Sequence, residues 1–394
     1  MILAKIAILA VTGYLLLASC WLLLLSLASW FYRPKLERNA FPLRLLVIIP
    51  SHNEEQQIAA TIHNTRKCDY PQELVDIAVI ADNCTDDTAK AADNCEARVH
   101  VRNDTRLRGK GAALDWFLRK NREKLEEYGG IVFIDADSCP HRNMLRALSQ
   151  SLSHPGVDVV QGFYVVENPY DNWRTALNSA AFNVFNHLRM AGNDRLFGRT
   201  VLKGLGMAFS PEILMKLGWP ANSEVEDVEF TIMLVENSIN VRYNSEAIIT
   251  SEMAVSMKQA DSQRRRWEGG RFNLAAEMIP RLGKEIFHGK IRYLYLLADL
   301  LIAPLSLLVL LTLISFLTAW ILMPAAIPVL LIIMGTIAFY VISGQLQRKA
   351  PARLWLYLFT FPLFLIWKSA LYLSMLVLPR KRAWKRTLRK SELN

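Results

Sequence analysis

The chain has 394 residues, of which 52% are hydrophobic, and its formal net charge is +10. The basic residues cluster beside apolar runs, in YRPKLER, QRKAPAR and RKRAWKRTLRK, which is typical of membrane flanks and argues against nucleic-acid binding. The five cysteines form no CxxC pair and have no histidine at zinc-ligand spacing, which argues against a zinc site and fits a reducing cytoplasm.

The first predicted element is an apolar helix. The run from Ile6 to Trp30 is almost uncharged and long enough to cross a hydrocarbon core of roughly 30 Å. A secretory signal peptide has a shorter apolar core and a cleavage site of small residues, which SLASWFYRPKLER matches only weakly. We therefore predict an uncleaved transmembrane helix over residues 1–31, followed by a linker over residues 32–43.

The charged segment that follows alternates short apolar runs with helical patterns. Predicted strands are RLLVIIP, LVDIAVIAD, ARVHV and GGIVFIDAD, and predicted helices are NEEQQIAATIHNT, CTDDTAKAADNC with Thr85 as N-cap, and GKGAALDWFLRKN. Strands and helices alternating at this spacing indicate βαβ units. The expected fold class is α/β, with a doubly wound, mostly parallel sheet.

Polar residues follow three of these strands, in SHNEE, ADNCTDD and DADS. In such sheets a ligand binds outside the carboxyl ends of the strands. Turn formation or helix capping suffices to explain Asn83, Asp86 and Asp87. It does not explain Asp135 and Asp137, because two carboxylates one residue apart repel each other unless a cation lies there. Hard ions such as Mg²⁺ prefer oxygen ligands, so we expect a divalent metal at this strand end.

Several common nucleotide and hydrolase motifs are missing. LRGKGAA lacks the GxxxxGK[ST] pattern of a phosphate-binding loop, and GLGMAF lacks the third glycine of a dinucleotide-binding loop. The sequence also has no GxSxG elbow. These observations disfavour an ATPase, a dehydrogenase and a serine hydrolase.

Apolar runs return near the C-terminus, over Tyr293–Trp320, Ala325–Ser343 and Leu354–Leu378. Lysine and arginine beside them predict a multi-pass protein of the inner (plasma) membrane with its charged domain in the cytoplasm. If every run crossed once, the basic tail would lie outside, against the same rule. Pro362 and Lys368 favour a re-entrant or interfacial hairpin for the last run, so we expect a cytoplasmic tail. The predicted segments are an interfacial helix over 279–292, transmembrane or interfacial helices over 293–379, and a basic tail over 380–394.

Taken in order, VIIPSHNEE, VIADNCTDDT, RGKGAALDW, FIDADS, EVEDVEF and QRRRW resemble the motifs of family 2 glycosyltransferases. The resemblance extends from Arg44 to Arg271 and is greater to membrane-embedded members, the synthases of cellulose, chitin, hyaluronan and poly-N-acetylglucosamine. It implies a GT-A domain over residues 44–278. Such a domain binds a nucleoside diphosphate sugar, usually a UDP-sugar, together with Mg²⁺ or Mn²⁺.

The resemblance also implies which residues contact the donor. The residues implied to contact the nucleotide sugar are Pro50, His52, Asn53, Glu54, Asp82, Lys110, Asp135 and Arg266. Among them, Asp82 corresponds to a position that contacts the nucleoside, and Arg266 to one that holds the diphosphate, which suits a guanidinium. Asp135 and Asp137 correspond to the Asp-x-Asp motif that binds the metal ion, with Asp137 as the principal ligand.

VEDVEF corresponds to the motif whose aspartate is the catalytic base, here Asp227 with Glu226 beside it. Alone, EVEDVEF also fits an acidic helix start stabilised by the helix dipole. A valine replaces the usual threonine. A base is chemically reasonable because an alcohol is a poor nucleophile until a carboxylate removes its proton.

Gln263, Arg266 and Trp267 correspond to the QxxRW motif, in which Gln263 and Trp267 are expected to contact the acceptor. Arg264, Arg265 and Arg271 have a second explanation, as surface charge that faces anionic lipid. LKGLGMAFS stands where the family has a loop near the acceptor, but it lacks the cysteine-containing signature of cellulose-type enzymes. Processivity and the identity of a polymer therefore stay open.

The leading functional prediction is an inverting transferase that extends a β-linked surface polysaccharide from a nucleotide sugar. The alternative in the same class is transfer of one sugar to a membrane lipid or lipid-linked glycan. An alternative of another class is a non-catalytic, nucleotide-sensing membrane scaffold, which the intact motif residues disfavour. The expected partners are the donor, a glycan or lipid acceptor, membrane lipids and export proteins, without nucleic acid.

Overall fold

The computed structural model describes residues 2–221 and 223–377. The chain forms two compact units. The sheet unit contains Arg33–Asn168 and Phe197–Met253. The helical unit contains the described residues up to Tyr32, Pro169–Leu196 and the described residues from Ala254 onward. The predicted basic tail, 380–394, lies outside the described residues.

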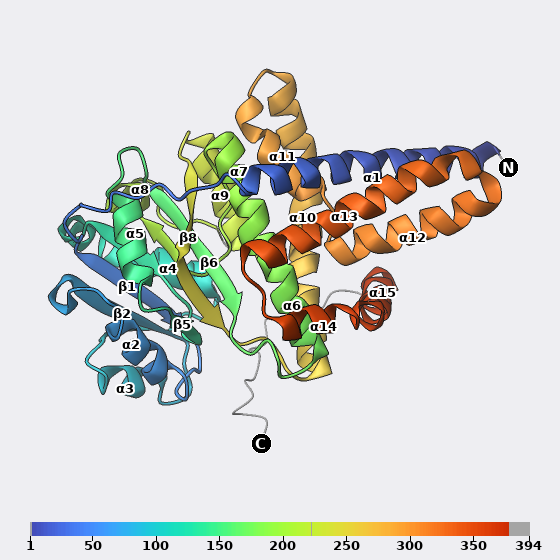
Figure 1. Ribbon diagram of the computed structural model, residues 1–394. Helices are drawn as coiled ribbons and strands as arrows, with labels where there is room; N and C mark the ends of the chain where they lie inside the picture. The colour runs from blue at the N-terminus through green and yellow to red at the C-terminus, as the bar shows by residue number, and fades with distance from the viewer. Residues whose placement is uncertain (1, 222, 378–394) are drawn as a thin grey trace. The chain divides into compact units, whose positions relative to one another are not determined.

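Eight strands of the sheet unit form one sheet in the order β3-β2-β1-β4-β7-β6-β8-β5 (Figure 1). The strands are β1 (Leu45–Ser51), β2 (Val75–Asp82), β3 (Arg98–Arg102), β4 (Gly130–Phe133), β5 (Ser138–Pro140), β6 (Val159–Val166), β7 (Met207–Phe209) and β8 (Val241–Ser251). Strand β1 pairs in parallel with β2 and β4, β2 with β3, and β6 with β8, whereas β7 and β5 run antiparallel to their neighbours. This mixed, parallel-rich sheet confirms the predicted α/β class.

Helices cover both faces of the sheet. Its helical elements are α2 (Ile58–Arg66), η1 (Gln72–Leu74), α3 (Thr88–Asp93), α4 (Lys110–Lys120), η2 (Arg122–Glu127), α5 (Met144–Leu152), α8 (Pro211–Leu217) and α9 (Glu226–Glu236). Val47 and Ile49 of β1 pack in one core with residues of α2 and α5. Leu46 and Ile48 pack in a second core with residues of α4, α8 and α9. Successive strand residues point to opposite faces, so a fully apolar strand fills two cores.

Two predicted helix starts are wrong. Helix α2 begins at Ile58, after the residues NEEQQ, which form a turn. Thr85 does not cap α3, because the helix begins at Thr88 and its N-cap residue is Asp87. Asp86 instead accepts from the backbone N–H of Thr88 at 3.1 Å, at the start of α3.

The helical unit holds α1, the elements from α6 to α7, and the described elements after β8. Its elements are α1 (Ile2–Ser29), α6 (Trp173–Phe182), the π-helical segment η3 (Asn183–Leu188), α7 (Arg189–Phe197), α10 (Met257–Phe287), η4 (Ile291–Tyr293), α11 (Leu294–Leu301), α12 (Leu305–Leu322), η5 (Pro324–Ala326), α13 (Ile327–Gln347), α14 (Ala352–Leu358) and α15 (Phe361–Val377). The segment 279–292, predicted as an interfacial helix, contains the end of α10 and the start of η4.

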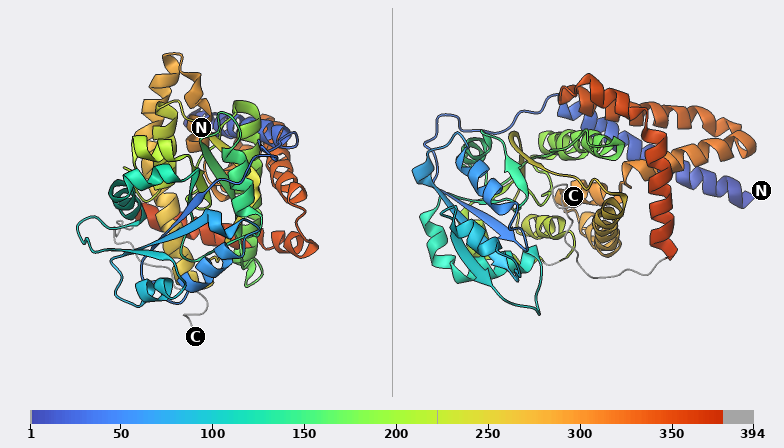
Figure 2. Two further views of the ribbon diagram at one scale, coloured as in Figure 1. Left: turned by 90° about the vertical axis from the view of Figure 1, so that its left-hand side faces the viewer. Right: turned by 90° about the horizontal axis from the view of Figure 1, so that it is seen from below.

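Three described helices are long and apolar enough to cross a membrane: Ile2–Ser29, Leu305–Leu322 and Pro324–Gln347. Ala352–Leu358 and Phe361–Met375, bent by 55°, make a fourth span if they are counted as one. Helices α1, α12 and α13 run side by side (Figure 2) and bury Leu22, Leu308 and Ile333 in a shared core. These helices indicate a membrane protein.

The apolar run Tyr293–Trp320 is not one helix. Helix α11 ends at Leu301 and α12 begins at Leu305, with Pro304 as its N-cap residue. Proline has no N–H and disfavours helical geometry in the residue before it, so the break occurs there.

Candidate active site

The turns after β1 and β2 are fixed to each other. The His52 ring Nδ1 lies 2.7 Å from the carbonyl oxygen of Asp82. Asn53 has a φ of 56°, in the left-handed region that asparagine tolerates, and the Glu54 N–H donates to Oγ1 of Thr88 at 2.8 Å. Pro50 is paired with Ile80 in the register of β1 and β2. The structure thus brings Pro50, His52, Asn53 and Glu54 together with Asp82, as the motif order implied.

Asp82 is held in a buried ion pair that the sequence did not reveal. Its Oδ1 accepts from Nη1 of Arg102 at 2.6 Å, and both side chains are almost fully buried. Burial raises the pKa of the Asp82 carboxyl, and the Arg102 guanidinium opposes this shift. Arg102 also donates to the Leu107 carbonyl at 2.7 Å, so it fixes the loop that leads to α4. No motif marks Arg102, because the pairing depends on the register of β2 against β3.

Lys110, the first residue of α4, connects two parts of the site. Its Nζ donates to Oδ1 of Asp135 and to the Gly204 carbonyl, both at 2.5 Å. Burial alone would lower the pKa of Lys110, but the nearby carboxylates of Asp135, Glu226 and Asp227 outweigh it and raise that pKa. The ammonium group therefore stays charged and links the strand end to the loop at Gly204.

Asp135 and Asp137 lie in a tight turn after β4. The Ser138 hydroxyl donates to the Asp135 carbonyl at 2.6 Å, and the Thr61 hydroxyl donates to the Ala136 carbonyl at 2.7 Å. Asp137 is half-buried. Within residues 2–221 and 223–377, no group of three or more His, Cys, Asp and Glu side chains is arranged to hold a metal ion. Any ion here would need oxygen ligands from a second molecule besides these carboxylates.

The loop 202–206 is anchored to three elements of the sheet unit. The fully buried Gln161 of β6 donates to the Leu205 carbonyl and accepts from the Lys203 N–H, both at 2.7 Å. The Leu202 N–H donates to Oγ1 of Thr231 in α9 at 2.9 Å. The Gly206 N–H donates to the carbonyl of Phe133, the last residue of β4, at 3.2 Å. The loop position is therefore fixed by side chains that the sequence analysis did not single out.

Asp227 lies directly against this loop. A Cβ built on Gly204, whose φ is +74°, would lie 3.5 Å from Oδ2 of Asp227. Thr231 Oγ1 donates to the Asp227 carbonyl at 2.8 Å, in the first turn of α9. The structure thus brings Lys110, Asp135 and Asp227 together around Gly204.

The two adjacent carboxyl groups of α9 are perturbed in the same direction. Burial raises the pKa of Asp227, while Lys203 and Lys110 oppose the shift. Burial raises the pKa of Glu226 as well, and the charge of Asp227 adds to it. Both residues stand in the first turn of the helix, where the helix dipole favours negative charge. The acidic helix start and a site for proton transfer are therefore compatible explanations of EVEDVEF.

QRRRW lies in α10 of the helical unit, so the predicted site residues belong to two units. Gln263 is buried, Arg266 and Trp267 are half-buried, and among the described residues no ion pair or hydrogen bond joins Arg266 to another side chain. The neighbouring arginines are engaged: Arg264 bonds to Asn178, Arg265 to Ser374 at 2.5 Å, and Arg271 to the buried Asp299. Charge facing lipid does not alone account for these three arginines.

Residues 42–270 match the family described as "Glycosyltransferase like family 2". The chain is 26% identical over 247 residues to the probable glycosyltransferase YdaM of Bacillus subtilis, a match that covers 60% of this chain and 57% of that protein. It is 24% identical over 179 residues to the glycosyltransferase AglE of Haloferax volcanii, covering 44% and 54%. The chain thus spans little more than half the length of these curated relatives.

A solved structure shares the fold over nearly the whole chain. It is the mannosyltransferase PcManGT from Pyrobaculum calidifontis, in complex with GDP-Man and Mn²⁺. The two share 19% sequence identity and superpose with a TM-score of 0.58, over 95% of this chain and 99% of that one. The sheet unit accordingly has the GT-A fold. Because the family match covers more than half of this chain, the chain belongs to glycosyltransferase family 2.

Proposed function

We propose that the protein is an inverting glycosyltransferase that takes a sugar from a nucleoside diphosphate sugar and transfers it to an acceptor held at the membrane. The observation that carries this proposal is the position of Lys110, which bonds to Asp135 and to the Gly204 carbonyl beside Asp227. One ammonium group thereby joins an acidic strand end to a candidate base. The intact carboxylates also speak against a non-catalytic scaffold.

The donor would lie at the carboxyl ends of β1, β2 and β4. The turn from Pro50 to Glu54 and the buried Asp82 are suited to the nucleoside, since they are fixed before a ligand arrives. Lys110 would pair with the diphosphate, and the QxxRW motif implies the same role for Arg266. The donor base is expected to be uracil, and guanine is the second candidate because PcManGT was solved with GDP-Man.

Asp137 would be the principal ligand of Mg²⁺ or Mn²⁺, with Asp135 beside it. Both supply only carboxylate oxygens, which these hard ions prefer, and the diphosphate would supply the others. Asp137 is the principal candidate because of its place in the Asp-x-Asp motif, and Asp135 also bonds to Lys110. When bound, the ion offsets the negative charge that develops on the departing diphosphate.

Asp227 would act as the base. Its carboxylate accepts the proton of the acceptor hydroxyl while that oxygen bonds to the anomeric carbon and the bond to the diphosphate breaks. Attack opposite the leaving group inverts the anomeric centre. Thr231 bonds to the Asp227 backbone carbonyl, Gly204 lies beside the carboxylate, and Lys203 and Lys110 favour its charged form. Glu226 is the second candidate for this role, and Gln263 and Trp267 would contact the acceptor.

Two acceptors were expected from the sequence, a growing β-linked polysaccharide and a membrane lipid. A largely apolar cavity among the helices of the helical unit favours the lipid. The lysines and arginines beside the apolar runs support a multi-pass plasma-membrane protein with its catalytic unit in the cytoplasm. Polymer synthesis with export partners is the alternative that the experiment below also tests.

The test uses purified full-length protein, a panel of UDP- and GDP-sugars, and either lipid or oligosaccharide acceptors. Nucleotide release and product size are measured with Mn²⁺ or with EDTA. We expect one donor to give Mn²⁺-dependent release and a product enlarged by one sugar. A ladder of long products would support polymer synthesis instead. Donor binding without release, for every donor and acceptor, would contradict transferase activity.

A further inference from the structure

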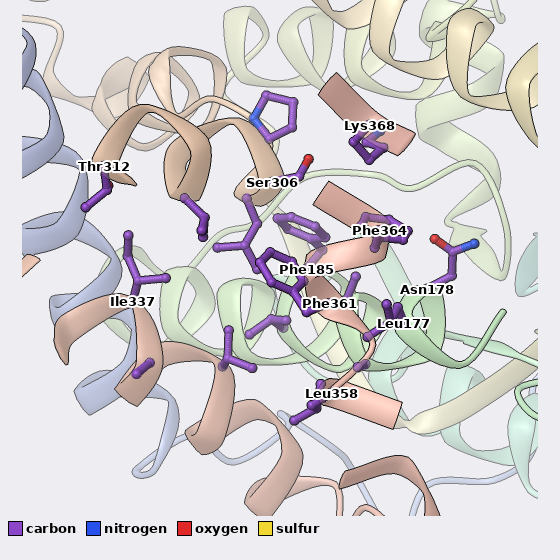
Figure 3. A pocket seen from close by; sticks show the side chains of 18 of the residues that line it. Leu177, Asn178, Phe185, Ser306, Thr312, Ile337, Leu358, Phe361, Phe364 and Lys368 are labelled. Atoms are coloured by element: carbon purple, nitrogen blue, oxygen red, sulfur yellow. The ribbon is translucent and has the colours of Figure 1, made fainter. Parts of the chain in front are cut away.

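The helical unit encloses a cavity of about 390 Å³ that the reaction site does not use. This volume lies within the range of roughly 300–1,000 Å³ that is typical of small-molecule sites. Its walls come from α6 and η3, α10, α12, α13 and the two helices α14 and α15 (Figure 3). Most lining side chains are apolar, including Phe185, Ile337 and Phe361.

The cavity reaches the outer surface of the membrane-spanning helices. Leu313 of α12, and Met334 and Ile342 of α13, line it and are also 38%, 38% and 42% exposed. Both helices are long and apolar enough to cross a membrane, so this exposed surface would face hydrocarbon. An apolar chain could therefore enter from the bilayer without passing through water.

Charged side chains gather at one end of this cavity. In Figure 3, Lys368 and Asn178 lie at the end away from Thr312 and Ile337. Lys368 forms an ion pair with Glu268, and both are largely buried. Arg264 also lines the cavity, so two cationic side chains and one carboxylate line this end. Lys368 lies in the bent pair Ala352–Leu358 and Phe361–Met375, and ionisable side chains inside a membrane span are costly and usually functional.

One carboxylate oxygen at this end is poorly satisfied within the described residues. Oε2 of Glu268 is buried and no hydrogen bond reaches it with good geometry, although the Tyr372 side chain lies close to this carboxylate. A donor on a bound molecule would satisfy it, and Arg264 and Lys368 could pair with a phosphate. The end therefore suits a headgroup with both an anionic oxygen and a hydroxyl, as in a phosphate that carries a sugar.

The charged end of the cavity lies next to the QRRRW segment, since both include residues of α10. Arg264 and Glu268 are four residues apart and share one face of α10, next to the face of Gln263 and Trp267. Bonds from α15 fix this segment: Nε1 of Trp367 donates to Oδ1 of Asp261 at 2.8 Å, and Ser374 accepts from Arg265 at 2.5 Å. A headgroup at Glu268 would thus lie beside the motif expected to contact the acceptor. The π-helical turns of η3, a feature frequent at functional sites, form part of the wall.

We infer that this cavity binds the apolar chain of a lipid-linked acceptor, with its phosphate at Arg264, Glu268 and Lys368, and that the attacking hydroxyl belongs to a sugar carried on that phosphate. The identification of this lipid as the acceptor rests on the proposed function, whereas the binding of the lipid in the cavity does not. The chain can be fatty-acyl or isoprenoid, since both are apolar and flexible, and the experiment separates them.

Binding is tested by photocrosslinking with the full-length protein in phosphatidylcholine nanodiscs. Three probes carry a diazirine in the chain: a single-chain acyl phosphate, an isoprenyl phosphate and the neutral acyl alcohol. Ala338→Trp fills the cavity, whereas Ile332→Trp, on the exposed surface of the same helix, is the matched control. Val309→Phe narrows the cavity from α12 if Ala338→Trp does not fold. Donor binding reports that each variant is folded.

We expect at least one phosphate probe to label peptides of α6, η3 and α12. Labelling should fall about tenfold in Ala338→Trp and stay unchanged in Ile332→Trp. The neutral alcohol should label more weakly than the phosphate. Whichever phosphate probe labels the cavity shows whether the bound chain is acyl or isoprenoid. Equal labelling of Ala338→Trp and Ile332→Trp, or no labelling by either phosphate, would overturn the inference.

The acceptor role has a separate readout. Sugar transfer into the extracted lipid should be lost in Ala338→Trp while donor binding persists. If Ala338→Trp transferred sugar to lipid normally, the acceptor assignment would be wrong and the proposed function would stand. If no donor turned over but the phosphate probe still labelled the cavity, the proposed function would fail and the lipid site would stand.

Discussion

Nζ of Lys110 lies 2.5 Å from Oδ1 of Asp135, and it lies equally close to the Gly204 carbonyl. This contact joins residues from the start of α4 and the end of β4 to the loop beside α9. The geometry makes the loop 202–206 as important for the site as the acidic residues themselves. It also predicts that changes to the loop backbone impair turnover.

Gly204→Ala tests that role of the loop. A left-handed φ of +74° disfavours alanine, and the added Cβ would contact Oδ2 of Asp227. Gly156→Ala is a matched control, because its φ is +76° and its Cβ would meet no atom within 4 Å. Both variants should lose about 1 kcal/mol or more in the free energy of unfolding. Only Gly204→Ala should lose most of its turnover, measured as the initial rate of sugar transfer.

Asp137→Ala should abolish Mn²⁺-dependent binding of the donor, because the proposed metal would lose its principal ligand. The protein should still fold, since Asp137 is only half-buried. Donor titration with Mn²⁺ and with EDTA measures the effect, and Asp93→Ala, on the exposed surface of α3, serves as control. Unchanged Mn²⁺-dependent binding in Asp137→Ala would assign the metal elsewhere.

Arg266→Ala should weaken donor binding together with turnover, because a guanidinium paired with the diphosphate would be lost. Arg265→Ala removes a neighbouring arginine that bonds to Ser374 and should leave the donor dissociation constant unchanged. Isothermal titration with the donor compares the two variants. Equal weakening in both would mean that the helix, rather than the Arg266 charge, determines donor affinity.

In a plot of the transfer rate against pH, the rate should rise on the acidic side, the acidic limb, as Asp227 loses its proton. Burial raises the pKa of Asp227, and only its deprotonated form can accept a proton, so the limb should lie above the usual aspartate pKa of about 4. Lys203→Met should move the limb to higher pH, because Lys203 favours the charged carboxylate. The measurement is the turnover number at saturating donor across the pH range. A limb that moves to lower pH in Lys203→Met would contradict this assignment.

Much of the GT-A core was predictable from local patterns. The apolar strand RLLVIIP fills two cores with alternate residues, and DADS follows the strand that the pattern predicted. Predicted helix starts were wrong by a few residues: α2 begins at Ile58, and the N-cap residue of α3 is Asp87 rather than Thr85. Pro304 did carry a signal for the break between α11 and α12.

The residues that hold the site residues in place could not be predicted from the sequence, for a physical reason. Arg102 pairs with Asp82 across two strands, and Gln161 bonds to a loop more than forty residues later. Such pairs depend on register and on crossovers, which periodicity does not encode. The cavity likewise requires helices from three separated segments, so only the fold could place Arg264 beside Lys368.

The central claim is that Asp227 is the base, and the most direct test compares Asp227→Asn with the unaltered protein in one preparation. Asparagine keeps the size of the side chain and its contacts with Gly204, but it cannot accept the acceptor's proton. Initial rates at saturating donor should fall by about 10²-fold or more, the usual scale for a positioned base. The donor dissociation constant, titrated in parallel, should change little. Transfer by Asp227→Asn at near the unaltered rate would contradict the account and make Glu226 the next candidate.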